Sequence, residues 1–203
     1  MENVMMNELE LSAIGEVANI SLGNAATSLG VLIRDDIDIS IPYVEVKKSG
    51  DIIKQRTDKS IITRVDYVKG LQGCSILFLK EEDVKVMTDL MMGSDGHGMF
   101  YQQELSELHL SAMAESMNQM MGAAATAMGA MLGQVVDIST PQTIHMSAGE
   151  YFTETFPEHD RFIQITFEVQ MGSMIKTVMV QLYPYILAKA IADLFIMHKA
   201  GIQ

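Results

Sequence analysis

Hydrophobic residues recur with a helical period along two long segments of this chain. Between residues 11 and 32, and again between residues 110 and 131, apolar side chains return every three or four positions. That spacing places them along one side of an α-helix, so each segment is predicted to bury this side in a core. The two apolar stripes consist of Leu11, Ile14, Ala18, Leu22, Ala25, Leu29 and Leu32, and of Leu110, Met113, Met117, Met121, Ala124, Met128 and Met131.

Shorter stretches with the alternation typical of strands follow each predicted helix. Strands are expected around residues 37–46, 60–68 and 73–80, and around 136–147, 161–170 and 174–183. Each group is followed by an amphipathic stretch that predicts a second helix, near Asp89-Leu90 in one case and Asp193-Leu194 in the other. The connections between strands are too short for crossover helices, which favours antiparallel pairing.

The two halves of the chain are copies of one another. Residues 11–42 and 110–141 align without a gap at an offset of 99, and 14 of the 32 positions are identical. Average residue usage would give roughly two identities by chance, so the chain contains an internal duplication. We therefore expect one α+β domain of two helix–strands–helix halves with pseudo-twofold symmetry and a mainly antiparallel sheet. It would span residues 1–203, with repeat one at about 8–93, a linker at about 94–103 and repeat two at about 104–200.

A second row of positions keeps its residue types in both long helices, about a third of a turn from the apolar stripe. The row comprises Ser12, Glu16, Asn19 and Gly23, and then Ser111, Glu115, Asn118 and Gly122. Nearby positions that are expected to be exposed differ between the repeats: Ile20 corresponds to Gln119, and Val17 corresponds to Ser116. Asn is a poor helix-interior residue, because its amide competes with the backbone hydrogen bonds. The retained Glu and Asn therefore indicate a functional face on each helix. The alternative is that these polar residues are incidental surface residues.

The two glycines of this row cost about 1 kcal/mol each relative to alanine in a helix. Their missing side chains would let another backbone come close to the row. Packing against another helix inside the protein explains them equally well.

Composition excludes several functions. The net charge is −12, from 26 acidic and 14 basic side chains, so neither nucleic acid nor an anionic membrane surface is an expected partner. No leader and no stretch of about 20 apolar residues is present, which predicts a cytoplasmic protein without membrane insertion.

Cys74, in an apolar run, is expected to be a buried thiol. The 18 methionines are interpreted mainly as core filler, with a partner-binding surface as the alternative for Met120.

The row extends into a longer motif that resembles the signature of a known family. The spacing Ser12-x3-Glu16-x2-Asn19-x22-Pro42 recurs unbroken as Ser111-x3-Glu115-x2-Asn118-x22-Pro141. It resembles the CheC, CheX and FliY family of CheY-phosphate phosphatases, and two complete motifs are similar to CheC or FliY rather than to CheX. The amino-acid sequence of residues 116–126 is most similar to that of the FliY central domain. The chain is thus interpreted as a FliY core, with a freestanding CheC-like protein as the alternative.

The resemblance implies an enzyme that hydrolyses the aspartyl phosphate of the chemotaxis response regulator CheY. It implies no cofactor of its own and no metal site, since the regulator carries the Mg²⁺. The five histidines also lack the paired spacing of a zinc site. Flagellar switch proteins are expected partners of a FliY-like chain, at the cytoplasmic face of the basal body, and CheD is the expected partner of a CheC-like chain. The rival interpretation is a switch module that docks phosphorylated CheY without hydrolysing it.

The resemblance also implies roles for the motif residues. Asn19 and Asn118 would position a water, since an amide offers both a donor and an acceptor. Glu16 and Glu115 would pair with a lysine of the regulator. Supporting positions are Ser12 and Ser111, while Pro42 and Pro141 would fix the chain where the first strand turns.

Overall fold

The duplication in the sequence is also a duplication of secondary structure. The computed structural model describes residues 6–156, 161–172 and 175–202, so the start of the strand expected at 174 lies outside the described residues. The elements in chain order are α1 (Glu8–Ile33), β1 (Ile37–Ile39), β2 (Tyr43–Lys48), α2 (Ser49–Gln55), β3 (Lys59–Lys69), β4 (Gly73–Leu79), α3 (Glu81–Met91), α4 (Met99–Gln102), α5 (Glu107–Leu132), β5 (Asp137–Ile138), β6 (Gln142–Ser147), α6 (Ala148–Thr155), β7 (Arg161–Met171), β8 (Ile175–Pro184) and α7 (Tyr185–Lys199).

The eight strands form one sheet whose order reads symmetrically from its centre. The order is β1-β7-β8-β4-β3-β5, with β2 also paired to β7 and β6 also paired to β3. Every pairing among the described strands is antiparallel, as predicted. The first strands of each half pair with the long strand of the other half, for example Val44 with Ile165 and Ile144 with Ile62. Neither half therefore holds a complete sheet of its own, and the expected α+β fold is confirmed.

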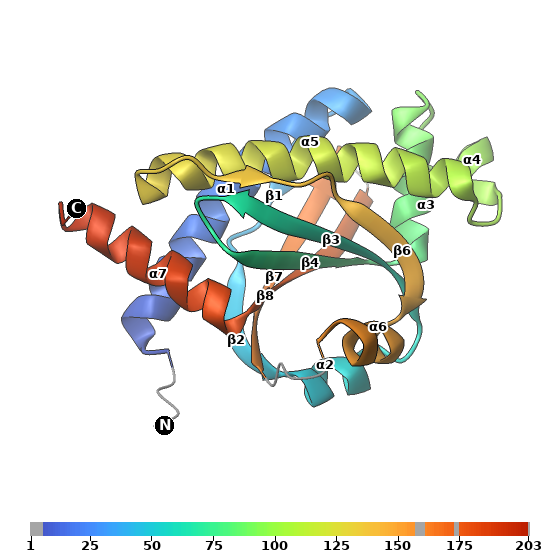
Figure 1. Ribbon diagram of the computed structural model, residues 1–203. Helices are drawn as coiled ribbons and strands as arrows, with labels where there is room; N and C mark the ends of the chain where they lie inside the picture. Colours follow the sequence, from blue (N-terminus) through green and yellow to red (C-terminus); the bar gives the residue numbers. More distant parts are fainter. Residues whose placement is uncertain (1–5, 157–160, 173–174, 203) are drawn as a thin grey trace.

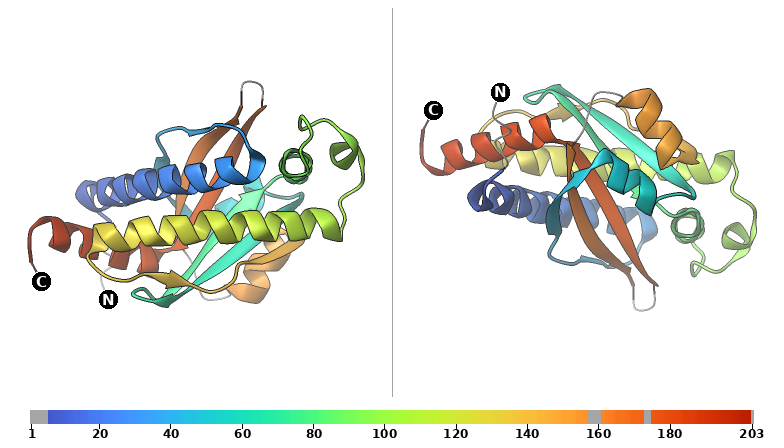
Figure 2. Two further views of the ribbon diagram at one scale, coloured as in Figure 1. Left: turned by 90° about the horizontal axis from the view of Figure 1, so that it is seen from above. Right: turned by 90° about the horizontal axis from the view of Figure 1, so that it is seen from below.

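Two long helices cover one face of this sheet. α1 and α5 lie side by side and run in opposite directions, with α7 beside α1 and α3 beside α5 (Figures 1 and 2). Their apolar stripes face the sheet: Leu29 and Met117, for example, are completely buried. Met120 is also buried, so the alternative of a partner-binding surface there is wrong.

The expected exposure of one pair of corresponding positions, Val17 and Ser116, is wrong. Val17 and Ser116 are buried rather than exposed, and the Ser116 hydroxyl donates to the carbonyl oxygen of Ala112 at 2.9 Å. Their difference reflects core packing. Ile20 and Gln119, by contrast, are exposed as expected.

The opposite face of the sheet is covered by two short helices that the sequence pattern did not predict. α2 and α6 bury Ile52 and Phe152 against a second core cluster that includes Phe78 and Phe162 (Figure 1). Alternate residues of one strand reach opposite faces, since Leu77 belongs to the first core cluster and Phe78 to the second. A signal for α6 was present, because Ser147 caps its first turn and Glu150 completes the capping box.

The segment that connects the two halves is held by hydrogen bonds to the buried carboxylate of Asp89. Asp89 accepts hydrogen bonds from the backbone N–H groups of Gly96, Gly98 and Phe100 at 2.9 to 3.1 Å. Burial by itself raises the pKa of the Asp89 carboxyl, but these N–H groups and the Ser94 hydroxyl outweigh it and hold the pKa below its usual value. The linker expected at 94–103 is thus tied to α3.

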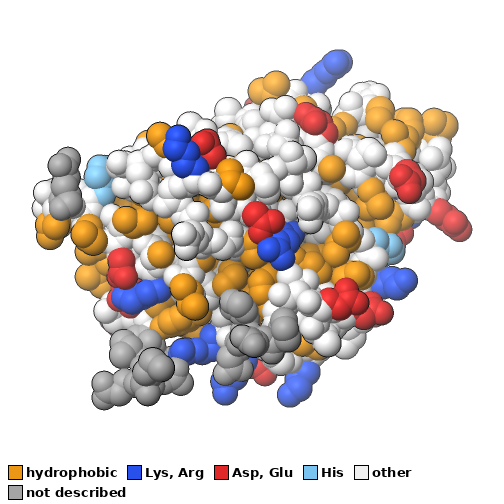
Figure 3. All heavy atoms as spheres, in the orientation of Figure 1, with side chains coloured by type: hydrophobic (Ala, Val, Ile, Leu, Met, Phe, Trp, Pro, Cys, Tyr) orange, Lys and Arg blue, Asp and Glu red, His pale blue; other side chains and the backbone are white. Residues whose placement is uncertain are grey.

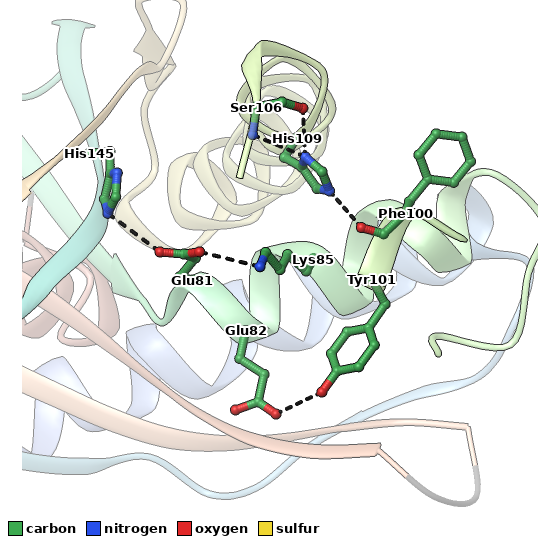
Figure 4. Close-up of polar contacts among 8 residues, drawn as sticks. All are labelled: Glu81, Glu82, Lys85, Phe100, Tyr101, Ser106, His109 and His145. Atoms are coloured by element: carbon green, nitrogen blue, oxygen red, sulfur yellow. Dashed lines mark hydrogen bonds and ion pairs between the residues drawn. The ribbon is translucent and has the colours of Figure 1, made fainter. Parts of the chain in front are cut away.

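The short helix α4 in this connection is tied to both neighbouring helices (Figure 4). The Tyr101 hydroxyl donates to the carboxylate of Glu82 on α3 at 3.1 Å. His109 Nε2 lies 2.8 Å from the carbonyl oxygen of Phe100, and its Nδ1 lies 2.8 Å from the Ser106 hydroxyl at the start of α5. His109 is buried and holds the entry to α5, which is a structural role.

Replacing Asp89 by asparagine should lower the free energy of unfolding by about 1–3 kcal/mol at pH 7. The substitution removes the negative charge and turns one of the two acceptor oxygens into an NH2 donor that faces backbone N–H groups. The folded pKa is depressed, so this stabilisation is present above the unfolded pKa of about 3.9 and is lost as the pH falls through the folded value. Urea unfolding from pH 7 downward measures both effects. Asp95→Asn, an exposed carboxylate in the same loop, is the control and should change little. An unchanged stability of Asp89→Asn at pH 7 would contradict this account.

Candidate functional site

The first motif converges on one hollow of the surface. Ser12, Glu16 and Asn19 lie exposed on α1, and the segment between β1 and β2 folds back beside them. The open hollow, of about 460 Å³, is lined by Leu11, Ser12, Gly15, Glu16, Asn19, Ile41, Pro42, Tyr43 and Val44. Asn19 and Pro42, 23 positions apart in the sequence, therefore line the same hollow, and Pro42 lies at the turn between the two strands.

The rim of this hollow is apolar. Ile41 and Tyr43 are 84% and 64% exposed, on either side of Pro42. Isolated exposed apolar residues are ordinary on protein surfaces, but here they flank a row of polar residues retained by both repeats. This rim is part of the site that sequence reasoning missed, because the helix pattern does not show which loop lies beside it.

The second motif has the same helical geometry with different surroundings. Ser111, Glu115 and Asn118 are exposed on α5, whereas Pro141 is buried between β5 and β6. The predicted exposure of the Glu and Asn side chains is thus confirmed in both halves. The rim positions that correspond to Ile41 and Tyr43 are Thr140 and Gln142, so the loop beside the second motif is polar.

The two asparagines are free to bind a solvent molecule. Among the described residues, neither Asn19 nor Asn118 makes a side-chain hydrogen bond. Asn24, one turn further along α1, shows the alternative, because its amide donates to the carbonyl oxygen of Ile20 at 2.9 Å. An exposed amide without an internal partner can offer both its donor and its acceptor to one water.

The two glutamates have different partners within the chain. Both oxygens of Glu16 accept hydrogen bonds from Lys199 Nζ, at 2.8 and 2.9 Å. Glu115 accepts a neutral hydrogen bond from Gln119 Nε2 at 2.9 Å. No basic side chain of the described residues pairs with Glu115. The two motifs therefore share residue types but not electrostatics.

The glycines of the row lie in open space. A Cβ added at Gly23 or Gly122 would meet no atom within 4 Å, so packing against another helix of the protein does not explain them. Gly30, which both repeats also retain, is different because its Cβ would lie 2.9 Å from the carbonyl oxygen of Asp35. The open glycines leave a shallow stretch of helix beside each Glu-Asn pair.

Other chemistry finds little support in the described part of the chain. It holds no group of three or more His, Cys, Asp or Glu side chains able to bind a metal ion. The Cys74 thiol is buried, and burial raises its pKa to about 11, so it is a structural thiol rather than a nucleophile. Within the same residues, no helix is long and apolar enough to cross a membrane. On the face shown in Figure 3, basic side chains are scattered rather than clustered.

Fold and site together define a class of protein: a duplicated α+β domain with one Ser-Glu-Asn-Pro motif in each half. The chain belongs to the CheC-like family, whose model matches residues 9–46 and 108–145, the segments that carry the two motifs. It is 36% identical over 185 residues to the flagellar motor switch phosphatase FliY of Bacillus subtilis, covering 91% of this chain and 48% of that protein. The chain thus spans about half the length of this relative.

Solved structures agree with this assignment. The crystal structure of FliY from Thermotoga maritima matches with a TM-score of 0.86 and 32% identity, covering 95% of this chain and 98% of that one. The predicted likeness to FliY is confirmed. A chain of the FliG–FliM complex from H. pylori has the same fold, with a TM-score of 0.74 at 15% identity, covering 93% of this chain and all of that one.

Gly23→Ala and Gly122→Ala should each raise the free energy of unfolding by up to about 1 kcal/mol, because alanine favours a helix and the added methyl group meets open space. Gly30→Ala is the matched control and should destabilise the protein, since its methyl group would press on a backbone carbonyl. Chemical denaturation of the three variants measures the differences. A loss of stability in Gly23→Ala would show that this position is not open.

Proposed function

We propose that this chain hydrolyses the aspartyl phosphate of a chemotaxis response regulator, CheY, at the flagellar motor switch. The observation that carries the proposal is a pair of exposed asparagines, Asn19 and Asn118, each one turn from a retained glutamate. Neither side chain makes a hydrogen bond within the described part of the chain. The likeness to two FliY proteins, one of them named a flagellar motor switch phosphatase, supports the reaction and the location.

The reaction asks little covalent work of this chain. A water oxygen attacks the phosphorus, the bond from phosphorus to the aspartate oxygen breaks, and the products are inorganic phosphate and the free carboxylate. The regulator would supply the Mg²⁺ that neutralises the developing charge. The phosphatase would hold one water in line with the breaking bond, and correct positioning of a reactant is a large part of catalytic rate enhancement. The asparagine amide would do this from a rigid helix.

Each glutamate would fix the regulator in place. A carboxylate on the same helical face as the amide, three residues earlier, can pair with a cation of the regulator and set the distance from amide to phosphate. The open glycines at 23 and 122 give a protein partner room to approach the helix closely. At the first motif, Ile41 and Tyr43 would add apolar contacts to the same partner.

Replacing both asparagines tests the proposal. Asn19→Ala and Asn118→Ala should each remove part of the acceleration of phosphate release from phosphorylated CheY. The double variant should lose nearly all of it, a drop on the order of 10²-fold, as found when a positioned polar group is removed from an active site. Single-turnover release of phosphate at saturating phosphatase measures this loss without a contribution from binding.

Asn24→Ala is the matched control, because it removes an exposed asparagine from the same helix and the second repeat already has alanine there, at Ala123. It should leave the rate unchanged. A double variant as active as the parent would rule out water positioning by these amides. A parent protein that binds phosphorylated CheY without accelerating phosphate release would instead be a docking module.

A further inference from the structure

The first motif differs from the second in carrying its own cation. Lys199 lies 183 positions from Glu16 in the sequence, yet its Nζ contacts both carboxylate oxygens, at 2.8 and 2.9 Å. A glutamate held in this way already has the type of partner that the proposed function requires of the regulator. A lysine of the regulator can pair fully with Glu16 only by displacing Lys199.

The helix that carries Lys199 holds it in this place. α7 lies along α1, and Lys189, nearer its start, forms ion pairs with Glu10 on α1 and with Asp193 on α7. Lys199 Nζ also lies 5.0 Å from the centre of the Phe195 ring, one turn earlier, and that ring is buried. The cation is therefore presented to Glu16 by an anchored helix.

The second motif has no equivalent cation among the residues that the structure describes. α3 is the counterpart of α7, since the two helices begin at Glu81 and Tyr185, an offset of 104, and the same offset pairs Asp89 with Asp193. By this offset Asp95 corresponds to Lys199, but α3 ends at Met91, so Asp95 lies in the loop beyond the helix and α3 has no residue as far along its axis as Lys199. In the described part of the chain, Glu115 has a neutral amide partner instead. Its carboxylate is open to a cation from outside.

We propose that Lys199 restrains the first site by competing with the regulator for Glu16, which leaves the second site as the stronger one. This inference rests on the proposed pairing of Glu16 with a cation of the regulator. Lys199 is a positioning residue: it acts through Glu16 and touches neither the water nor the phosphoryl group. Duplication has thus produced one site open to its partner and one that is partly self-occupied.

The expected effect is modest. Both side chains are well exposed, 61% for Lys199 and 45% for Glu16, and exposed ion pairs are weakened by solvent. Removing the competitor should therefore strengthen binding at the first site by about two- to fivefold. The effect should appear in KM and not in kcat, because the water-positioning amide of Asn19 is unchanged.

Binding to each site can be measured separately. Glu115→Ala with Asn118→Ala disables the second site, and Glu16→Ala with Asn19→Ala disables the first. Each background is prepared with and without Lys199→Met, and its affinity for CheY activated with beryllofluoride is measured by titration at low salt. We expect Lys199→Met to tighten binding about two- to fivefold when only the first site works, and to change nothing when only the second works.

Two controls separate charge from structure. Lys199→Arg keeps a cation on Glu16 and should bind like the parent, while Lys54→Met removes the same charge from the exposed end of α2 and should have no effect. Binding at the first site that is equal, weaker or absent in Lys199→Met would overturn the proposal. Phosphate release by the double asparagine variant tests the proposed function independently. If Lys199→Met binds more tightly but the protein does not hydrolyse the phosphate, the proposed phosphatase activity is wrong and the competition for Glu16 still holds.

Discussion

The packing of α1 against α5 is the constraint on which the rest of this structure depends. Each helix has one apolar stripe, and burying a side chain such as Leu29 or Met113 contributes about 1.5–3 kcal/mol. With those stripes turned to the sheet and to each other, the retained polar rows can only face solvent. The sheet reinforces this arrangement, because β2 and β6 each pair with the long strand of the other half. The two candidate sites are therefore consequences of the same core.

Duplication explains why the sites are alike, and later change explains why they differ. Both halves keep the serine, glutamate, asparagine and proline, and both keep an open glycine on the same row. Around this frame, the first half has an apolar rim at Ile41 and Tyr43, together with a lysine on its glutamate. The second has threonine, glutamine and no cation among the described residues. Under the proposed function, differences of this kind would let one chain bind the same partner in two ways.

Most of the fold could be predicted from the sequence because its signals are local. Helical spacing indicated α1 and α5, alternation indicated the strands, and the repeat indicated the symmetry. The short helices α2 and α6 were missed because seven or eight residues show too little periodicity, although the Ser147–Glu150 capping box was a usable signal. Ser116 was misplaced because a hydroxyl can be buried when it bonds to its own helix.

The motif itself could be predicted because both halves preserve it, but its surroundings could not. Contacts such as that between Lys199 and Glu16 join residues 183 positions apart, and no local sequence pattern predicts them. The same holds for the loop that brings Ile41 beside Asn19.

The central claim is that an asparagine amide in each half holds a water against a partner's phosphorylated carboxylate. The most direct measurement is a crystal structure of this chain with CheY activated by beryllofluoride. The account predicts that Asn118 or Asn19 lies within reach of the beryllofluoride group through a single water, with hydrogen bonds of about 2.6–3.2 Å. A complex in which the regulator's phosphorylation site lies far from both asparagines would contradict it.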